Sequence, residues 1–157
     1  MDYWIKAIGA SRSPLDDEWL RPLRNDKGEL TAPRLAERVH FPKSAKPRGI
    51  SVGDLFLLYG VTQIGGRIIA AGRFDTPFYE DDGSREPGER TAEDLAAWPW
   101  RIDVTILLSL WHAHRGPTLD AIDLPGTKIR RRSHIRLPGG REQYLEGVDA
   151  LAGVARI

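Results

Sequence analysis

Residues 102–111 alternate between an apolar face and a mostly polar face, and no other stretch constrains the fold as strongly. The apolar face of this extended segment comprises Ile102, Val104, Ile106, Leu108 and Leu110. The opposite face comprises Asp103, Thr105, Leu107, Ser109 and Trp111. A period of two over this length predicts a half-buried antiparallel strand. The chain must therefore bury one face of a sheet.

Two further apolar runs, residues 54–59 and 67–74, predict a hairpin whose loop ends in Gly65-Gly66. Gly72 lies inside the second run, which indicates a bulge or a close backbone approach. An opening strand is expected at 3–8 and a last one at 129–137. The connections are too short for parallel crossovers, so we expect an α+β domain with a mostly antiparallel, barrel-like sheet and short flanking helices.

The flanking helices are expected from capping residues and from apolar spacing. Ser13 followed by Pro14 predicts one helix start, and Thr31 predicts another. Thr91 and Asp94 resemble a capping box for a short third helix. The chain then closes with an amphipathic helix in which four residues repeat at helical spacing: Tyr144, Leu145, Val148 and Leu151. Residues 1–157 are interpreted as one domain, with a mobile acidic insertion at 79–91.

Composition narrows the function classes. The chain has no cysteine, which excludes disulfides, thiolate metal sites and a cysteine nucleophile and fits a reducing cytoplasm. No apolar run is long enough to span a bilayer, and the first residues do not form a signal peptide, so we expect a cytoplasmic protein that does not bind membranes. Net charge is +1, which argues against nonspecific coating of nucleic acid. The oligomeric state stays open.

No catalytic motif is present, and the chain is not expected to be an enzyme or to carry a cofactor. The Gly-rich pieces lack the lysine and following helix of a phosphate loop, and no serine is framed as in hydrolases. His112 and His114 have a spacing that metal sites use, but a third ligand is not evident. We therefore expect neither a catalytic nor a metal site.

The last predicted strand, 129–137, is strongly basic. Alternate side chains of a strand lie about 6.6 Å apart. A row of cationic or titratable side chains is therefore expected on one face: Arg130, Arg132, His134 and Arg136. Such a row suits phosphate oxygens. An exposed strand that is kept soluble, or an edge that is protected by charge, explains the pattern equally well.

Aromatic residues at strand and loop ends give a second signal. Phe41, Tyr59, Phe78 and Tyr79 occupy such positions, where a flat side chain can stack on a base. Packing in the core explains each of them individually. As a set beside a basic strand, they favour a site for a nucleic acid.

The order of the segments "YWIKAI", "VGDLFLLYG", "GGRIIAAGRFDTPFYED", "WPWRIDVTILL" and "RRRSHIRL" resembles an EVE domain of the PUA-like superfamily, which is related to YTH and ASCH domains. The resemblance covers most of the chain. It implies a PUA-like barrel and a pocket for a modified base of DNA or RNA.

By this resemblance, Tyr59 occupies the position of the tyrosine in the Gly-Asp strand, and Tyr79 matches the aromatic after the next strand. Trp100 matches the tryptophan that opens the Trp-x-hydrophobic-Asp-Val strand, and Phe41 is placed in the loop before Gly53-Asp54. Two segments depart from the family. "AIGAS" replaces the Ser-Glu-Pro motif, and "HFPKSAKPRG" replaces the Arg-Asn-Tyr loop.

The sequence thus predicts a non-enzymatic domain that binds DNA or RNA and takes a modified or flipped base into an aromatic pocket. The alternative is a small-molecule or protein-interaction module on the same barrel. The predicted site residues are Phe41, Tyr59, Tyr79, Trp100, Arg130, Arg132, His134 and Arg136.

Overall fold

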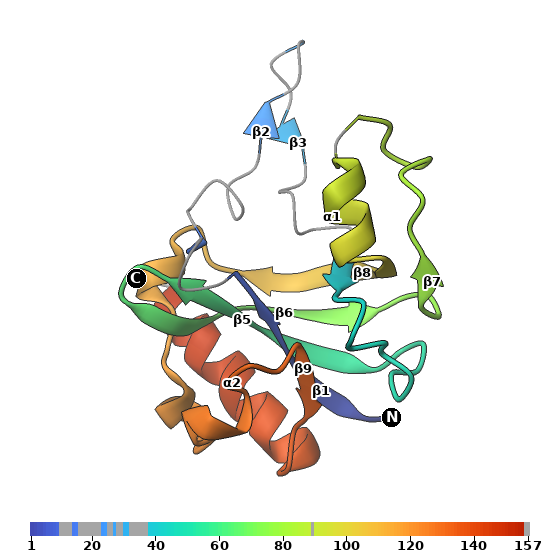
Figure 1. The fold of residues 1–157 in the computed structure, drawn as a ribbon. Coiled ribbons are helices and arrows are strands. Elements are labelled where there is room, and N and C mark those ends of the chain that lie inside the picture. The colour runs from blue at the N-terminus through green and yellow to red at the C-terminus, as the bar shows by residue number, and fades with distance from the viewer. Residues whose placement is uncertain are drawn as a thin grey trace.

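A computed structural model describes residues 1–9, 14–15, 23–24, 27, 30–31, 38–88 and 90–155. Its main feature is one curled sheet with a long C-terminal helix against one face (Figure 1). The strands are β1 (Tyr3–Ile8), β2 (Leu23–Arg24), β3 (Leu30–Thr31), β4 (Arg38–Phe41), β5 (Leu55–Thr62), β6 (Gly65–Phe74), β7 (Tyr79–Glu80), β8 (Trp100–Ser109) and β9 (His134–Arg136). The helices are α1 (Ala92–Ala97) and α2 (Gly140–Ala155), with short 3-10 turns at Ala113–Arg115, Leu119–Ile122 and Gly126–Lys128.

The main sheet has the order β4-β8-β6-β5-β1-β9, with β7 also paired to β8. Only β1 and β5 run parallel among these pairs; the others are antiparallel. The expected α+β class and the mostly antiparallel sheet are therefore confirmed. The sheet is an open half-barrel rather than a closed barrel, because its end strands β4 and β9 do not pair within the described chain.

Two register shifts bend the sheet. One lies at Leu58/Tyr59 in the β5–β6 pair, and the other at Ala71/Gly72 in the β6–β8 pair. A Cβ atom on Gly72 would lie 2.7 Å from the Phe56 ring and 2.8 Å from the Thr105 carbonyl oxygen. Both expectations for Gly72, a bulge and a close approach, are confirmed. Bulges increase local twist, which explains the curl.

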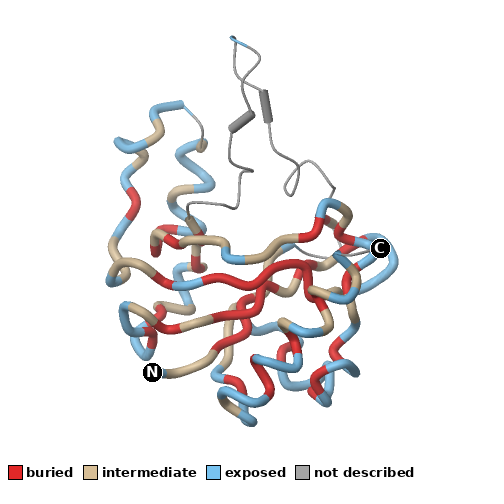
Figure 2. Tube along the Cα trace, turned by 180° about the vertical axis from the view of Figure 1, so that it is seen from behind, coloured by how far each residue is buried: buried red, intermediate tan, exposed pale blue. Residues whose placement is uncertain are grey.

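Each face of the sheet carries its own core, and Figure 2 shows buried residues concentrated along the central strands. The concave face holds Trp4, Phe41, Phe56, Leu58, Phe74 and Ile102. The other face packs against α2 and holds Ile5, Leu57, Tyr144 and Leu151. The predicted C-terminal helix is therefore confirmed. Gly147 allows its close approach, because a Cβ there would lie 2.4 Å from Leu57.

The strand predicted at 129–137 is wrong over most of its length. Only His134–Arg136 pairs, with β1, and Arg131 has a left-handed backbone with φ of 60°. Ile129 and Leu137 are both buried in the core on the α2 side. The chain turns between Ile129 and Leu137, and this turn allows both side chains to enter the core. We attribute the loss of the strand to this turn. The four basic side chains consequently do not form a row.

The acidic segment is tied to the sheet. Glu86 forms a two-pronged ion pair with Arg101 of β8, and Asp81 meets Arg90 at 3.3 Å. Thr91 caps α1 by accepting a hydrogen bond from the Asp94 backbone N–H at 3.1 Å, as expected. The mobility of 79–91 stays a prediction.

The remaining expected helices fall mainly outside the described residues. This applies to the helix expected after Ser13. Thr31, the second expected cap, lies in β3, and residues 32–37 are not described. No helix in the described ranges is long and apolar enough to cross a bilayer.

Candidate nucleic-acid interface

The eight predicted site residues lie in three separate places. Phe41 and His134 meet on the concave face, Trp100 shares that face as the cross-strand partner of Phe41, and Arg136 lies at the rim. Tyr59, Arg130 and Arg132 line a cleft on the α2 side of the sheet. The third place holds Tyr79 alone, in an ion network beside β7. The single constellation expected from the sequence therefore does not form.

The concave-face cluster consists of Lys6, Phe41, Trp100 and His134. Phe41 and Trp100 are cross-strand partners in β4 and β8, so they share a face. The His134 ring contacts Phe41 edge-on, with ring centroids 5.0 Å apart. β4 and β9 are the two end strands of the open sheet, and their backbones do not pair within the described chain. The Phe41–His134 contact therefore joins the two ends through side chains.

Lys6 is the most unusual member of the cluster. Its side chain is 1% exposed, and its ammonium nitrogen lies 4.7 Å from the centre of the Phe41 ring. It donates one hydrogen bond, to the adjacent Ala7 carbonyl oxygen at 2.8 Å. Within the described chain it has no carboxylate partner. Burial lowers the pKa of Lys6 to about 7, because nothing nearby compensates the charge.

Two ring nitrogens of the cluster have no hydrogen-bond partner among the residues that the structure describes. They are Nε1 of Trp100 and Nδ1 of His134, both buried. Burial, with a smaller contribution from the charge of Lys6, lowers the pKa of His134 to about 4, so its ring is neutral at pH 7. A buried polar atom without a partner costs about 1–3 kcal/mol, and such atoms in folded proteins call for a reason such as a water or a ligand.

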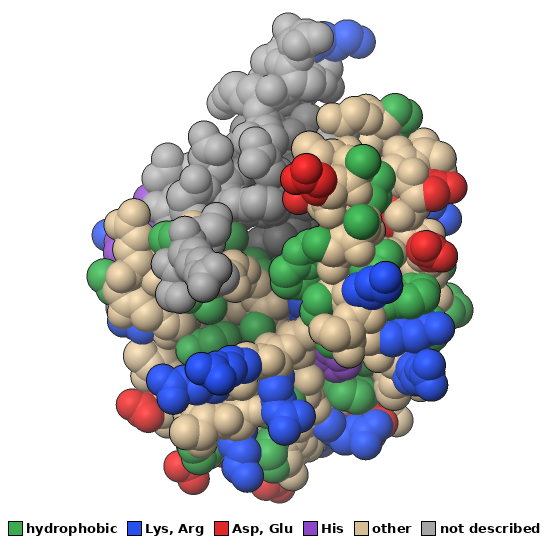
Figure 3. Space-filling view, in the orientation of Figure 1, with side chains coloured by type: hydrophobic (Ala, Val, Ile, Leu, Met, Phe, Trp, Pro, Cys, Tyr) green, Lys and Arg blue, Asp and Glu red, His purple; other side chains and the backbone are tan. Residues whose placement is uncertain are grey.

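Cations surround the rings at the rim. Lys46 lies 4.4 Å above Trp100 and 5.3 Å from Phe78, and Arg136 lies 4.8 Å from the Trp4 ring. Figure 3 shows Lys and Arg side chains gathered at the lower left and along the right of the face that it presents. This arrangement of cations around flat rings can hold a planar, negatively charged molecule.

Phe41 and Tyr79 do not fit their predicted roles as exposed stacking surfaces. Phe41 is fully buried in the concave core, since it must cover Lys6 and His134. The Tyr79 hydroxyl donates to Asp103 at 2.7 Å, and its ring lies 4.6 Å from the Arg85 guanidinium. Burial and the Asp103 hydrogen bond raise the pKa of Tyr79. Tyr79 is thus a structural member of the ion network.

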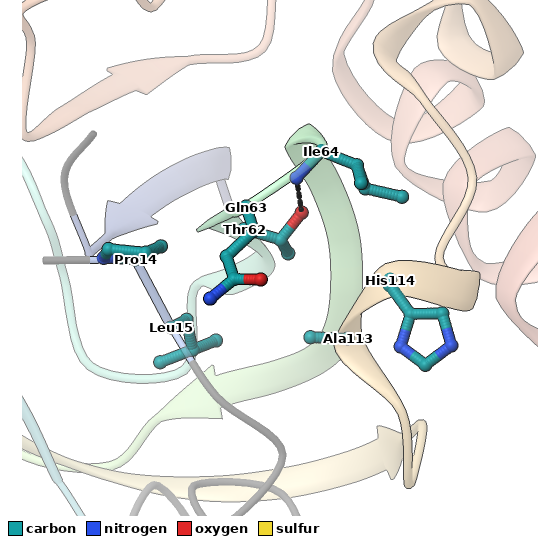
Figure 4. A pocket seen from close by; sticks show the side chains of 7 residues that line it. All are labelled: Pro14, Leu15, Thr62, Gln63, Ile64, Ala113 and His114. Carbon is teal, nitrogen blue, oxygen red and sulfur yellow. Dashed lines mark hydrogen bonds between the residues drawn. The ribbon is translucent and has the colours of Figure 1, made fainter.

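The turn between β5 and β6 borders another pocket, of about 340 Å³ (Figure 4). Figure 4 shows Thr62 accepting a hydrogen bond from the Ile64 backbone, with the Gln63 side chain reaching toward Leu15. His114 is the sole ionisable side chain among its described lining residues. The pocket offers too few polar groups to recognise a charged ligand.

The paired histidines lie beyond the end of β8 and not on a strand. β8 ends at Ser109, so His112 and His114 do not share a strand face, and His114 lies in a 3-10 turn. Their ring centroids are 5.7 Å apart. No group of three potential ligands occurs in the described ranges.

Sequence reasoning missed Lys6 and Lys46. The signal for Lys6 was present, since a lysine interrupts the otherwise apolar strand "YWIKAI". Lysines in strands commonly extend their charge to water, and nothing local distinguishes that case from burial. Lys46 lies in a Pro- and Lys-rich loop, where the sequence does not show which ring it would reach.

Neither a family model nor a curated protein matches the chain. Two structural-genomics crystal structures resemble it, one from Pseudomonas putida and one from Pseudomonas syringae, at 19% and 15% identity. Each match covers 98% of this chain and 99% of the other, with a TM-score of 0.44.

Proposed function

We propose that this protein is a non-enzymatic nucleic-acid-binding domain that receives an unpaired or flipped base at the concave-face cluster. One observation carries the proposal. Two buried ring nitrogens, on Trp100 and His134, have no partner within the described chain, and the His134 ring contacts the Phe41 ring over which the uncompensated amine of Lys6 lies. The edge of a base offers the carbonyl oxygens and ring nitrogens that such groups require.

The chemistry of the cluster suits a base better than a purely ionic ligand. Trp100 Nε1 is a donor only, Lys6 has spare N–H bonds, and neutral His134 can donate or accept at Nδ1. The half-buried ring of Trp100 supplies flat apolar surface for the plane of the base. Lys46 and Arg136, at the rim, are placed for the adjoining phosphates.

The resemblance to EVE domains supports a modified base as the preferred ligand. The net charge of +1 supports recognition of the base rather than of the backbone, since proteins that bind mainly phosphates are strongly basic. A domain of this kind should discriminate between bases and should lose affinity only gradually with salt.

The test is a fluorescence-anisotropy titration of labelled single-stranded oligonucleotides, with and without base modifications, at two salt concentrations. Trp100→Phe keeps a ring but removes the donor. Loss of one hydrogen bond, about 0.5–1.5 kcal/mol, should weaken binding by about 2- to 10-fold. Trp111→Phe is the matched control, because Trp111 is 61% exposed and lies outside the cluster.

Two results would overturn the proposal. One is the absence of binding to every oligonucleotide. The other is an equal effect of the Trp100 and Trp111 variants. Binding of free nucleosides with no preference for oligonucleotides would instead establish the alternative, a small-molecule module on the same half-barrel.

A further inference from the structure

The cleft beside Tyr59 lies on the opposite face of the sheet from the concave-face cluster. It is about 860 Å³ in volume, within the range of small-molecule sites. Its described lining comprises Ala7, Gly9, Tyr59, Val61, Gly66, Gly126, Thr127, Ile129, Arg130, Arg131 and Arg132. Ala7 follows Lys6 in β1, and consecutive strand residues face opposite sides. A ligand in this cleft is therefore separated from the cluster by the sheet.

Three consecutive arginines line the cleft, which an extended strand would not permit. The left-handed backbone of Arg131, rare for residues other than glycine, belongs to the turn that brings all three to one side. None of them takes part in an ion pair among the described residues. The described lining also contains no carboxylate. Adjacent cations repel one another, so an anion bound there relieves the repulsion.

Tyr59 supplies a flat wall to the same cleft. Its ring lies against Gly66, where a Cβ atom would be 1.7 Å from the phenolic oxygen. Glycine at this position therefore leaves the space that the ring occupies. Burial raises the pKa of Tyr59, so the phenol stays neutral and presents a donor to an anion.

We propose that this cleft is a second binding site, independent of the concave-face cluster, for a nucleoside diphosphate. The phosphates are held by Arg130, Arg131 and Arg132, whose guanidinium forks match phosphate oxygens. The base or sugar lies along Tyr59. Clustered arginines next to a ring fit a compact ligand with several negative charges better than a single phosphate.

Isothermal titration with ADP, adenosine and inorganic pyrophosphate tests the site without using any oligonucleotide. ADP should bind, pyrophosphate should bind more weakly, and adenosine should not bind detectably. The double variant Arg130→Gln/Arg132→Gln should raise the Kd for ADP at least tenfold, since hydrogen bonds to charged groups contribute about 1.5–3 kcal/mol each. Both side chains are exposed, so the melting temperature should not change.

Three controls locate the binding. Arg48→Gln/Arg141→Gln removes two exposed charges elsewhere and should leave the Kd within about twofold. Tyr59→Leu should weaken ADP but not pyrophosphate. Trp100→Phe should leave ADP binding intact, which keeps this result separate from the proposed base site.

Several outcomes would overturn the inference. One is a failure of ADP to bind, and another is equal loss in the two double variants, which would indicate nonspecific charge attraction. If Arg130→Gln/Arg132→Gln loses oligonucleotide binding but keeps ADP binding, the cleft binds a nucleic-acid backbone instead of a nucleoside diphosphate.

Discussion

Two buried cations in this small protein, Arg101 and Lys6, differ in whether carboxylates compensate their charge. Arg101 is 4% exposed and is surrounded by carboxylates: Glu86 in a two-pronged pair, Asp103 at 2.8 Å and Asp81 at 3.8 Å. Lys6 is 1% exposed and has no carboxylate partner within the described chain. One cation is compensated, and the other is left with a single backbone hydrogen bond.

The difference distinguishes the structural role of Arg101 from the functional role proposed for Lys6. Burying a charge costs several kcal/mol unless partners offset it, and the Arg101 network provides that offset. The network also fixes the segment that carries Glu86 against β8. No carboxylate of the described chain offsets the cost of burying the Lys6 charge, so this cost lowers the stability of the folded protein. Uncompensated buried groups concentrate at functional sites, which is why the base site is proposed around Lys6.

The largest expected effect follows from removing Arg101, the compensated cation. Arg101→Met leaves Glu86, Asp103 and Asp81 with fewer partners, and it should lower the free energy of unfolding by about 3–5 kcal/mol. Urea denaturation at pH 7 measures this. Arg73→Met, which removes an exposed pair with Asp75, should cost below about 1 kcal/mol. Similar losses in both variants would mean that the network is not structural.

The uncompensated cation should respond in the opposite direction. Lys6→Met should stabilise the protein at pH 7, because it removes a buried amine and keeps an unbranched chain in its place. The folded-state pKa of Lys6, about 7, lies below its unfolded value of 10.5. The destabilisation is therefore complete below pH 7 and disappears as the pH rises toward 10.5, with about 1.36 kcal/mol at stake per pKa unit.

Urea midpoints of the wild type and Lys6→Met from pH 7 to 10 check this prediction. His134 is neutral in both folded and unfolded states over that range, so it does not contribute. The stability gap between the two proteins should shrink steadily as pH rises. A variant that is less stable than the wild type at every pH would show that Lys6 is a structural residue like Arg101.

A third prediction concerns Asp81, which belongs to the compensated network. Burial raises its pKa, but hydrogen bonds from the Gly83 N–H and His40 and the charge of Arg101 outweigh burial and lower the pKa to about 2. Its stabilisation, about 2 kcal/mol, is present above pH 4 and lost as the pH falls to 2. Asp81→Asn should flatten this loss in urea titrations, whereas Asp149→Asn, at an exposed position of α2 away from the network, should not. A wild-type curve that is already flat would contradict the assignment.

The sequence predicted the sheet better than the site because strands leave a local signal. Period-two alternation at 102–111 and the glycine at position 72 were sufficient for β8 and for the bulge in β6. The alternation at 129–137 led to the wrong prediction of a long strand. The same spacing arises when a turn buries both Ile129 and Leu137. The hydrophobic pattern of one segment does not show whether its residues pack in the core on the concave face or in the core on the α2 side.

The proposed base site could not be predicted because its members are far apart in the sequence and are brought together only by the folded sheet. Lys6 is buried by residues from β4 and β9, which approach it from the two ends of the curled sheet. Phe41, Trp100 and His134 were selected individually, and two of them for positions in an exposed pocket that does not form. The basic turn was recognised as cationic, but not as a separate cleft.

The smallest expected effect comes from a third kind of cation, one that is neither buried nor uncompensated. Arg85 has a side chain that is 57% exposed, lies 3.3 Å from Asp103 and stacks on Tyr79. Water and salt screen both contacts, so Arg85→Ala should cost below about 1 kcal/mol, and raising the salt should reduce the cost further. Urea denaturation at low and high salt measures this. A loss close to that of Arg101→Met would mean that contact with the network, rather than burial, decides what a cation contributes, and Lys6 would then need another explanation.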